Sequence, residues 1–158
     1  NAVGICELKA QEKDISLVWE CSESIAMRMN VPLTEQALVN LIDNAIKYSS
    51  EKRQVEIRAT IEMSEVIIKI QDQGSGIDTR HLDRIFERFY RVDAARSRKL
   101  GGTGLGLAIV KHIVQSHGGT VSVESNLNMG SKFTLKFLAP TNEKMELDEE
   151  RKVPETFS

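Results

Sequence analysis

The sequence predicts an α+β fold, a two-layer sandwich in which helices cover one face of a mixed, mostly antiparallel sheet. Three observations support it. Residues 34–48 carry apolar side chains at helical spacing, and residues 55–70 alternate apolar and polar side chains as paired strands do. A second helix pattern and two further strand patterns follow between 105 and 138. This order of elements is typical of two layers packed around one core.

The composition fits a single domain with an aliphatic core. The chain has 158 residues, of which 41% are hydrophobic and only 5% aromatic. Its net charge of −2 argues against a nucleic-acid-binding protein, which would carry a basic excess. Cys6 and Cys21 lack the spacing of a metal site, and no apolar run reaches the roughly 18 residues of a membrane span. We expect residues 1–140 to form the domain and 141–158 to be a charged, disordered tail.

The sequence predicts four helices and five strands. Helical patterns cover residues 2–11, 34–48, 79–86 and 105–117. Strand patterns cover residues 15–19, 55–62, 66–70, 120–125 and 132–138. Thr34 is a candidate N-cap of the long helix, the connection at 63–64 predicts an antiparallel hairpin, and the pair Gly118 and Gly119 is expected to end the last helix.

The long helix carries polar residues beside its apolar stripe. Asn40, Asn44 and Lys47 lie at i, i+4 and i+7 and therefore share one face. Asparagine is a mediocre helix former, and its amide oxygen is a suitable ligand for a hard cation such as Mg²⁺. Lys47 is placed to contact phosphates bound to that cation. A solvated polar face accounts for the same pattern, and the helix alone does not decide between the two.

Asp72 extends the inward-facing row of the second hairpin strand. A buried carboxylate is costly unless it is paired, and a ligand amine, such as the exocyclic amine of adenine, would satisfy it. Gly74 and Gly76 follow at once and allow the backbone to approach a flat ring. A simple turn at the end of a strand explains the same residues equally well.

The segment 101–106 is rich in glycine and runs directly into a predicted helix. Helix N-termini present free N–H groups and suit phosphate. The segment is not a Walker A loop, because no Gly-Lys-Ser/Thr closes it. It is not a dinucleotide fingerprint either, because no strand leads into it. A flexible hinge without a ligand is the alternative.

The segment 86–91 has the sequence Phe-Glu-Arg-Phe-Tyr-Arg. Phe86 and Phe89, at i and i+3, are expected to be core anchors. Arg91 opens a basic stretch that continues with Arg96, Arg98 and Lys99. This stretch fits either a loop that orders on a triphosphate or a plain basic surface loop.

Together these segments resemble the catalytic, ATP-binding domain of bacterial sensor histidine kinases. Residues 40–48, 72–77, 86–91 and 102–107 are similar to the N, G1, F and G2 boxes of that family, in that order. The resemblance spans about 35–138, and residues 88–98 are similar to the phosphate-sensing subgroup. One departure is Asn128, which stands where the family often has the first glycine of a Gly-x-Gly turn.

The resemblance implies a Bergerat-type fold and assigns roles to particular residues. Asn44, supported by Asn40, would bind Mg²⁺, while Lys47 and Arg91 would contact the phosphates as catalytic residues. Asp72 would accept the adenine amine. The other residues implied in nucleotide binding are Tyr48, Gly74, Gly76, Ile77, Tyr90, Gly102, Thr103, Gly104, Leu105, Gly106 and Leu107. Residues 92–103 would form a lid over ATP.

The activity implied is transfer of the γ-phosphoryl group of ATP to a histidine on the dimerisation helices of the same kinase. His81, His112 and His117 lack the sequence context of that acceptor and are expected to be structural. The parent protein would be a homodimeric receptor anchored in the inner membrane, with this domain in the cytoplasm and a response regulator as indirect partner. Alternatives are a superfamily ATPase or protein-serine kinase, or a nucleotide-binding module without transfer activity.

Overall fold

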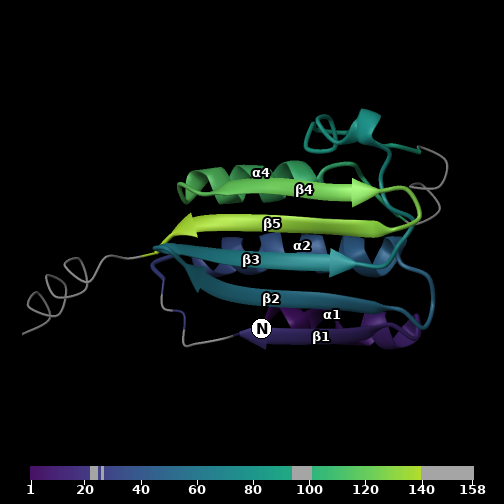
Figure 1. Cartoon of the computed structure of the whole chain (residues 1–158), viewed down its shortest axis with the longest axis horizontal. Helices are drawn as coiled ribbons and strands as arrows, with labels where there is room; N and C mark the ends of the chain where they lie inside the picture. Colours follow the sequence, from purple (N-terminus) through teal and green to yellow (C-terminus); the bar gives the residue numbers. More distant parts are fainter. Residues whose placement is uncertain (22–24, 26, 94–100, 140–158) are drawn as a thin grey trace, which may run out of the picture.

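The computed structural model describes residues 1–21, 25, 27–93 and 101–139 (Figure 1). The predicted tail at 141–158 and most of the predicted lid, including Arg96, Arg98 and Lys99, lie outside these residues.

Three α-helices, one short 3₁₀ helix and five strands make up the described chain. In order they are α1 (Ala2–Glu12), β1 (Ser16–Cys21), α2 (Val31–Tyr48), β2 (Gln54–Glu62), β3 (Glu65–Asp72), η1 (Thr79–His81), α4 (Gly106–Ser116), β4 (Thr120–Asn126) and β5 (Gly130–Leu138). Among the described residues, no helix is both long enough and apolar enough to cross a bilayer.

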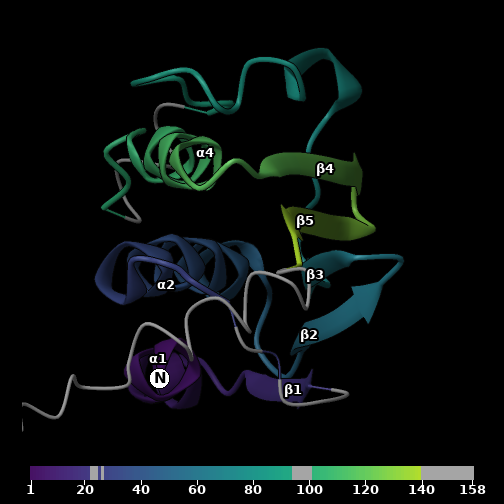
Figure 2. The same cartoon turned by 90° about the vertical axis from the view of Figure 1, so that its left-hand side faces the viewer.

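The sheet has the strand order β1-β2-β3-β5-β4, in which only β1 and β2 run parallel. Figure 2 shows α1, α2 and α4 side by side on one face of this sheet, with α2 in the middle. The predicted two-layer α+β fold with a mixed, mostly antiparallel sheet is therefore confirmed.

The two faces of the sheet differ as their alternating sequences require. Val55, Ile70, Phe133 and Leu135 face the helices and are buried together with apolar residues of all three. The opposite face carries cross-strand ion pairs, which join Glu20 to Arg58, Lys132 to Glu124, and Lys136 to Glu65. The uncovered face is thus polar, which explains why one layer of helices suffices.

The long helix begins earlier than predicted. Asn30, not Thr34, is the N-cap of α2, and its side chain accepts a hydrogen bond from the backbone N–H of Leu33. Pro32 lies in the first turn, where its missing N–H has no cost. The prediction of Thr34 was wrong because Pro32 was interpreted as punctuation before the helix, although proline is favoured at a helix start.

The predicted helix at 79–86 is only partly present. Asp78 caps a single 3₁₀ turn at Thr79–His81, and the chain continues in turns up to Phe89. The hairpin of β2 and β3 is confirmed, with Met63 and Ser64 at positive φ in its turn. The last helix ends as predicted, where Gly118 adopts φ +70° and Gly119 N–H donates to the carbonyl of Val114.

Candidate functional site

Asp72 is the last residue of β3 and faces the helical layer, as its position in the alternating row predicts. It is only 6% exposed. Its Oδ1 accepts hydrogen bonds from the backbone N–H groups of Gly74 (2.8 Å) and Ser131 (3.2 Å). Burial raises the pKa of the carboxyl, and these two hydrogen bonds offset only part of that rise. The carboxylate is held in a fixed orientation, and a further donor would stabilise its charged form.

Gly74 and Gly76 lie where the backbone leaves no space for a side chain. A Cβ atom at Gly74 would be 2.5 Å from the carbonyl oxygen of Tyr48, at the end of α2. At Gly76, which has φ +64°, a Cβ atom would be 1.9 Å from the carbonyl oxygen of Asn126. The loop after Asp72 is therefore pressed between α2 and the turn that joins β4 to β5.

That turn also accommodates the departure at Asn128. Asn128 adopts φ +63° and its backbone N–H donates to the carbonyl of Ser75 at 2.7 Å. Asparagine tolerates this left-handed conformation better than most residues, so the turn keeps its geometry without glycine. Ile77 is secured nearby, because its N–H donates to the Ser125 hydroxyl at 2.8 Å.

The polar face of α2 carries the predicted metal and phosphate residues. Asn40, Asn44 and Lys47 are each half-buried. Lys47 Nζ lies 2.6 Å from Oδ2 of Asp43, whose Oδ1 lies 2.6 Å from Lys9 Nζ of α1. Burial acts to raise the pKa of Asp43, but the hydrogen bonds to Lys47 and Lys9 hold it below its ordinary value. The phosphate contact predicted for Lys47 requires this ion pair to open or to share its lysine.

The start of α4 lies directly beside Asn40 of α2. A Cβ atom at Gly106 would be 3.8 Å from Oδ1 of Asn40, an ordinary contact distance. Gly104, with φ +75°, is pressed against the backbone of Phe89, whose N–H donates to its carbonyl at 2.8 Å. Two segments far apart in the sequence thus meet where the free N–H groups of a helix point.

The remaining residues of the glycine-rich segment adopt less constrained positions. Thr103 Oγ1 accepts a hydrogen bond from the N–H of Leu105, and Gly102 is half-buried. Leu107 packs against the hydrophobic core. This packing is sufficient to explain a leucine at position 107.

Of the two phenylalanines predicted as core anchors in the segment 86–91, only Phe86 is one. Phe86 packs edge-on against Phe133 and is a core anchor, as expected. Phe89 is 70% exposed at φ +65°, so the prediction that it is a second anchor was wrong. Its conformation follows from the backbone contact with Gly104, which turns the ring away from the core.

Tyr90 and Arg91 follow that turn. The Tyr90 hydroxyl lies 2.6 Å from Nδ1 of His81, and the guanidinium of Arg84 stacks 4.4 Å from the centre of its ring. Arg91 is half-buried. His117 likewise has partners: its Nε2 accepts the N–H of Asn30 and its Nδ1 lies 2.8 Å from the carbonyl of Ile113. His81 and His117 are structural, as predicted, whereas His112 is exposed on α4.

The comparison with known families identifies the family of this chain. The model of the histidine kinase-, DNA gyrase B- and HSP90-like ATPases matches residues 30–141. The chain belongs to this family. The matched range includes Asp72, the asparagines of α2 and the start of α4.

The relatives are sensor kinases. The sensor protein SrrB of Staphylococcus aureus is 46% identical over 106 residues, covering 67% of this chain and 18% of the relative. The chain therefore spans less than a fifth of that relative's length. Full-length ShkA in complex with AMPPNP has a TM-score of 0.77 at 29% identity, covering 89% of this chain and 29% of that one. The mycobacterial sensor histidine kinase MprB has a TM-score of 0.72 at 27% identity, covering 87% and 91%.

Several residues of the site were not predicted from the sequence. Ser131 and Gly130 hold Asp72 from β5, where a Cβ atom at Gly130 would lie 2.0 Å from the Asp72 carbonyl oxygen. Asp43 was passed over although it is four residues from Lys47, a spacing that favours an ion pair. Lys13 donates to carbonyls at the end of α2, and no sequence pattern indicated that contact.

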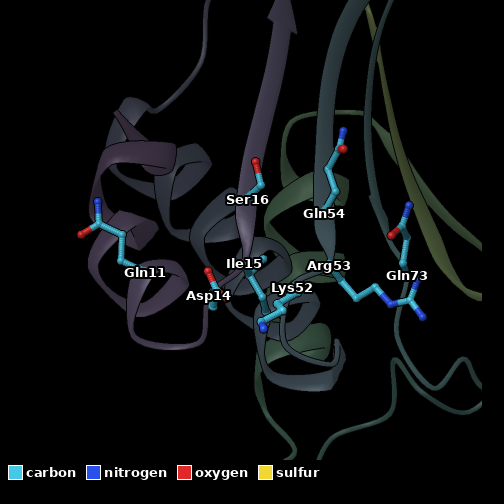
Figure 3. A pocket seen from close by; sticks show the side chains of 8 residues that line it. All are labelled: Gln11, Asp14, Ile15, Ser16, Lys52, Arg53, Gln54 and Gln73. Atoms are coloured by element: carbon cyan, nitrogen blue, oxygen red, sulfur yellow. The ribbon is translucent and has the colours of Figure 1, made fainter.

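A hollow of about 560 Å³ lies at the edge of the sheet, under the turn between α1 and β1 (Figure 3). Polar and charged residues make up most of its lining: Gln11, Asp14, Ile15, Ser16, Lys52, Arg53, Gln54 and Gln73. It contains none of the predicted nucleotide residues. It is therefore distinct from the site formed by Asp72, α2 and the start of α4.

Proposed function

We propose that this chain binds Mg·ATP and donates the γ-phosphoryl group to a histidine on the dimerisation helices of the same sensor kinase. The observation that carries the proposal is Asp72, a buried carboxylate oriented by two backbone N–H groups beside two glycines that have no room for a side chain. Its raised pKa marks a group that a ligand donor would stabilise.

The adenine base would lie against the loop that follows β3. Asp72 would accept the exocyclic amine, and Gly74, Gly76 and Ile77 would form the adjoining wall. Tyr48 and Tyr90 would line the remainder of the pocket. The nucleotide complex of ShkA, at 29% identity, supports nucleotide binding at this fold.

The phosphates would lie between α2 and the start of α4. Asn44 and Asn40 present neutral amide oxygens, a donor type that fits a hard cation retaining several waters. When bound, Mg²⁺ would neutralise part of the negative charge of the phosphates. The N–H groups at Gly104, Leu105 and Gly106 would donate hydrogen bonds to the phosphate oxygens, and Gly102 and Thr103 precede them in the loop.

Phosphoryl transfer asks for little covalent chemistry from this chain. A lone pair of the acceptor nitrogen would form the new P–N bond, and the bond from the γ-phosphorus to the bridging oxygen would break, releasing ADP. Lys47 and Arg91 would hold the phosphates in line and offset their charge. We place the acceptor on the dimerisation helices of the kinase, because His81, His112 and His117 all lack the sequence context of that acceptor.

The same proposal assigns the cellular context. The parent protein would be a homodimeric receptor anchored in the inner membrane, with this domain in the cytoplasm. The response regulator would take the phosphoryl group from the acceptor histidine. The near balance of 21 basic and 23 acidic residues does not favour nucleic acid as a partner.

Calorimetric titration with ATP, in the presence and absence of Mg²⁺, tests the binding half. We expect one site and a melting temperature that rises with nucleotide concentration. Absence of binding at millimolar nucleotide would reject the proposal.

Incubation with radiolabelled ATP and a separately produced dimerisation segment tests the transfer half. We expect label on that segment that is lost in acid and stable in alkali, as a phosphohistidine is. Acid-stable label would indicate a protein-serine kinase, and release of phosphate without any acceptor would indicate an ATPase. Binding without either reaction would identify a nucleotide-binding module.

A further inference from the structure

The C-terminal end of α2 is completed by a residue from the turn that follows α1. The last carbonyls of a helix lack partners within it, and glycine often supplies the turn that satisfies them. Here the residue after the helix is Ser49, in an extended conformation with φ −76° and ψ 152°. Its N–H reaches only the carbonyl of Ala45. The carbonyls that follow need donors from elsewhere.

Lys13 supplies most of those donors. Its Nζ lies 2.8 Å from the carbonyl oxygen of Ile46, 2.8 Å from that of Lys47 and 2.9 Å from that of Ser49. An ammonium group has three N–H donors, which equals the number of these carbonyls. Its positive charge also lies at the negative end of the α2 dipole, where a cation is favoured.

The backbone of Lys13 is itself held firmly. Its N–H donates to the carbonyl of Ala10, at the end of α1. The next residue, Asp14, has φ 54°, and its carbonyl accepts the N–H of Lys52 at 2.8 Å. The ammonium therefore extends from a closed turn between α1 and β1, not from a loose surface loop.

The carbonyl of Tyr48, which Lys13 does not contact, bonds to the loop that follows Asp72. Tyr48 accepts the N–H of Ser75 at 3.3 Å, and Ser49 forms an isolated antiparallel bridge with Gly74. Gly74 in turn donates to Asp72. The end of α2 is thus clamped between Lys13 on one side and the loop after Asp72 on the other.

We infer that Lys13 is a positioning residue of the nucleotide site, which sets the end of α2 against the loop that carries Gly74 and thereby aims the Asp72 carboxylate. The inference rests on the proposed function, because it assumes that Asp72 accepts the adenine amine. The buried hydroxyl of Ser49, which is 4% exposed and has no hydrogen-bond partner, marks the same junction.

The substitution Lys13→Met tests this role, because it keeps the length of the side chain and removes the donors. Lys52→Met is the matched control, because it removes the positive charge of a nearby lysine, which lines the hollow in Figure 3. Dissociation constants for Mg·ATP and Mg·GTP are measured well below each melting temperature. GTP carries a carbonyl oxygen where ATP carries the amine. The ratio of the two dissociation constants therefore reports the orientation of the Asp72 carboxylate.

We expect Lys13→Met to weaken Mg·ATP binding about tenfold, or about 1.4 kcal/mol, and to lower the preference for ATP over GTP. Lys52→Met should leave both unchanged. A lower melting temperature with unaltered ATP affinity and preference would overturn the inference and leave Lys13 as a helix cap only. If the wild-type chain binds neither nucleotide, the proposed function fails instead.

Lys13→Gln decides the question if the methionine variant does not fold. Its shorter, neutral side chain keeps an amide donor, and we expect a loss of about threefold in ATP affinity. Wild-type affinity and preference in a folded Lys13→Gln variant would overturn the inference.

Discussion

The adenine side and the phosphate side of the proposed site are built by different means. Around Asp72, backbone segments press against each other so closely that Gly74 and Gly76 have no room for a Cβ atom. Around Asn40, by contrast, Gly106 has space for one. The first region is part of the packed fold, whereas the second is a set of polar groups beside an open helix start. We therefore expect substitution of a glycine beside Asp72 to change stability and binding, and substitution of Gly106 beside Asn40 to change binding alone.

The largest difference is expected between two matched glycine substitutions. Gly74→Ala would place a Cβ atom 2.5 Å from a backbone carbonyl and should lower the free energy of unfolding by about 3 kcal/mol. Gly106→Ala meets only ordinary contacts and should leave it within about 0.5 kcal/mol, while weakening ATP binding. Denaturant unfolding of both variants measures the free energy of unfolding. Equal decreases in the two variants would contradict the proposed difference between the two sides.

Asp72→Asn separates the two properties on the adenine side. Its amide oxygen can still accept from Gly74 and Ser131, but the amide NH₂ would face the adenine amine. We expect ATP affinity to fall by about 2 kcal/mol, roughly thirtyfold.

The stability of Asp72→Asn should depend less on pH than that of the wild type. The folded pKa of Asp72 is raised, chiefly by burial, so its carboxyl destabilises the fold as pH increases from the ordinary pKa of 3.8 through the raised value. The variant lacks this loss and should be at least as stable as the wild type at pH 7. Thermal melts across that range measure it, and a clearly less stable variant would show that the ionised carboxylate supports the fold.

Asn44→Ala examines the metal on the phosphate side. Loss of an amide ligand should weaken Mg·ATP binding by about 1.5 kcal/mol and leave binding of ATP without Mg²⁺ unchanged. Gln36→Ala, on an exposed turn of the same helix, is the control. The two titrations are done with and without Mg²⁺, and an equal loss in both would argue that Asn44 contacts the nucleotide and not the metal.

Asp43→Asn gives the smallest expected effect. It removes the ion pairs with Lys9 and Lys47, so the free energy of unfolding at pH 7 should fall by about 1 kcal/mol. The pKa of Asp43 is lowered in the fold, so the wild type loses this stabilisation as the pH falls through that lowered value, below about 4. Release of Lys47 should also tighten ATP binding about twofold. A large loss of affinity would indicate instead that Asp43 binds the metal.

The sequence predicted those parts of the site whose residues lie close together along the chain. Asn40, Asn44 and Lys47 share a helix face, so their spacing alone placed them together. Asp72 was marked by its position in an alternating strand. Phe89 was misjudged because its spacing from Phe86 assumed a helix, whereas its backbone instead follows Gly104.

The sequence alone determined the two layers, the mixed sheet and the family, because periodicity and the four ordered motifs are local properties of the chain. Tertiary structure alone decided which groups complete the site. Lys13 reaches the end of α2 from the turn after α1, and Ser131 reaches Asp72 from the neighbouring strand β5. Neither contact has a spacing rule, because each depends on how separate elements pack, and packing is settled only when the whole core forms.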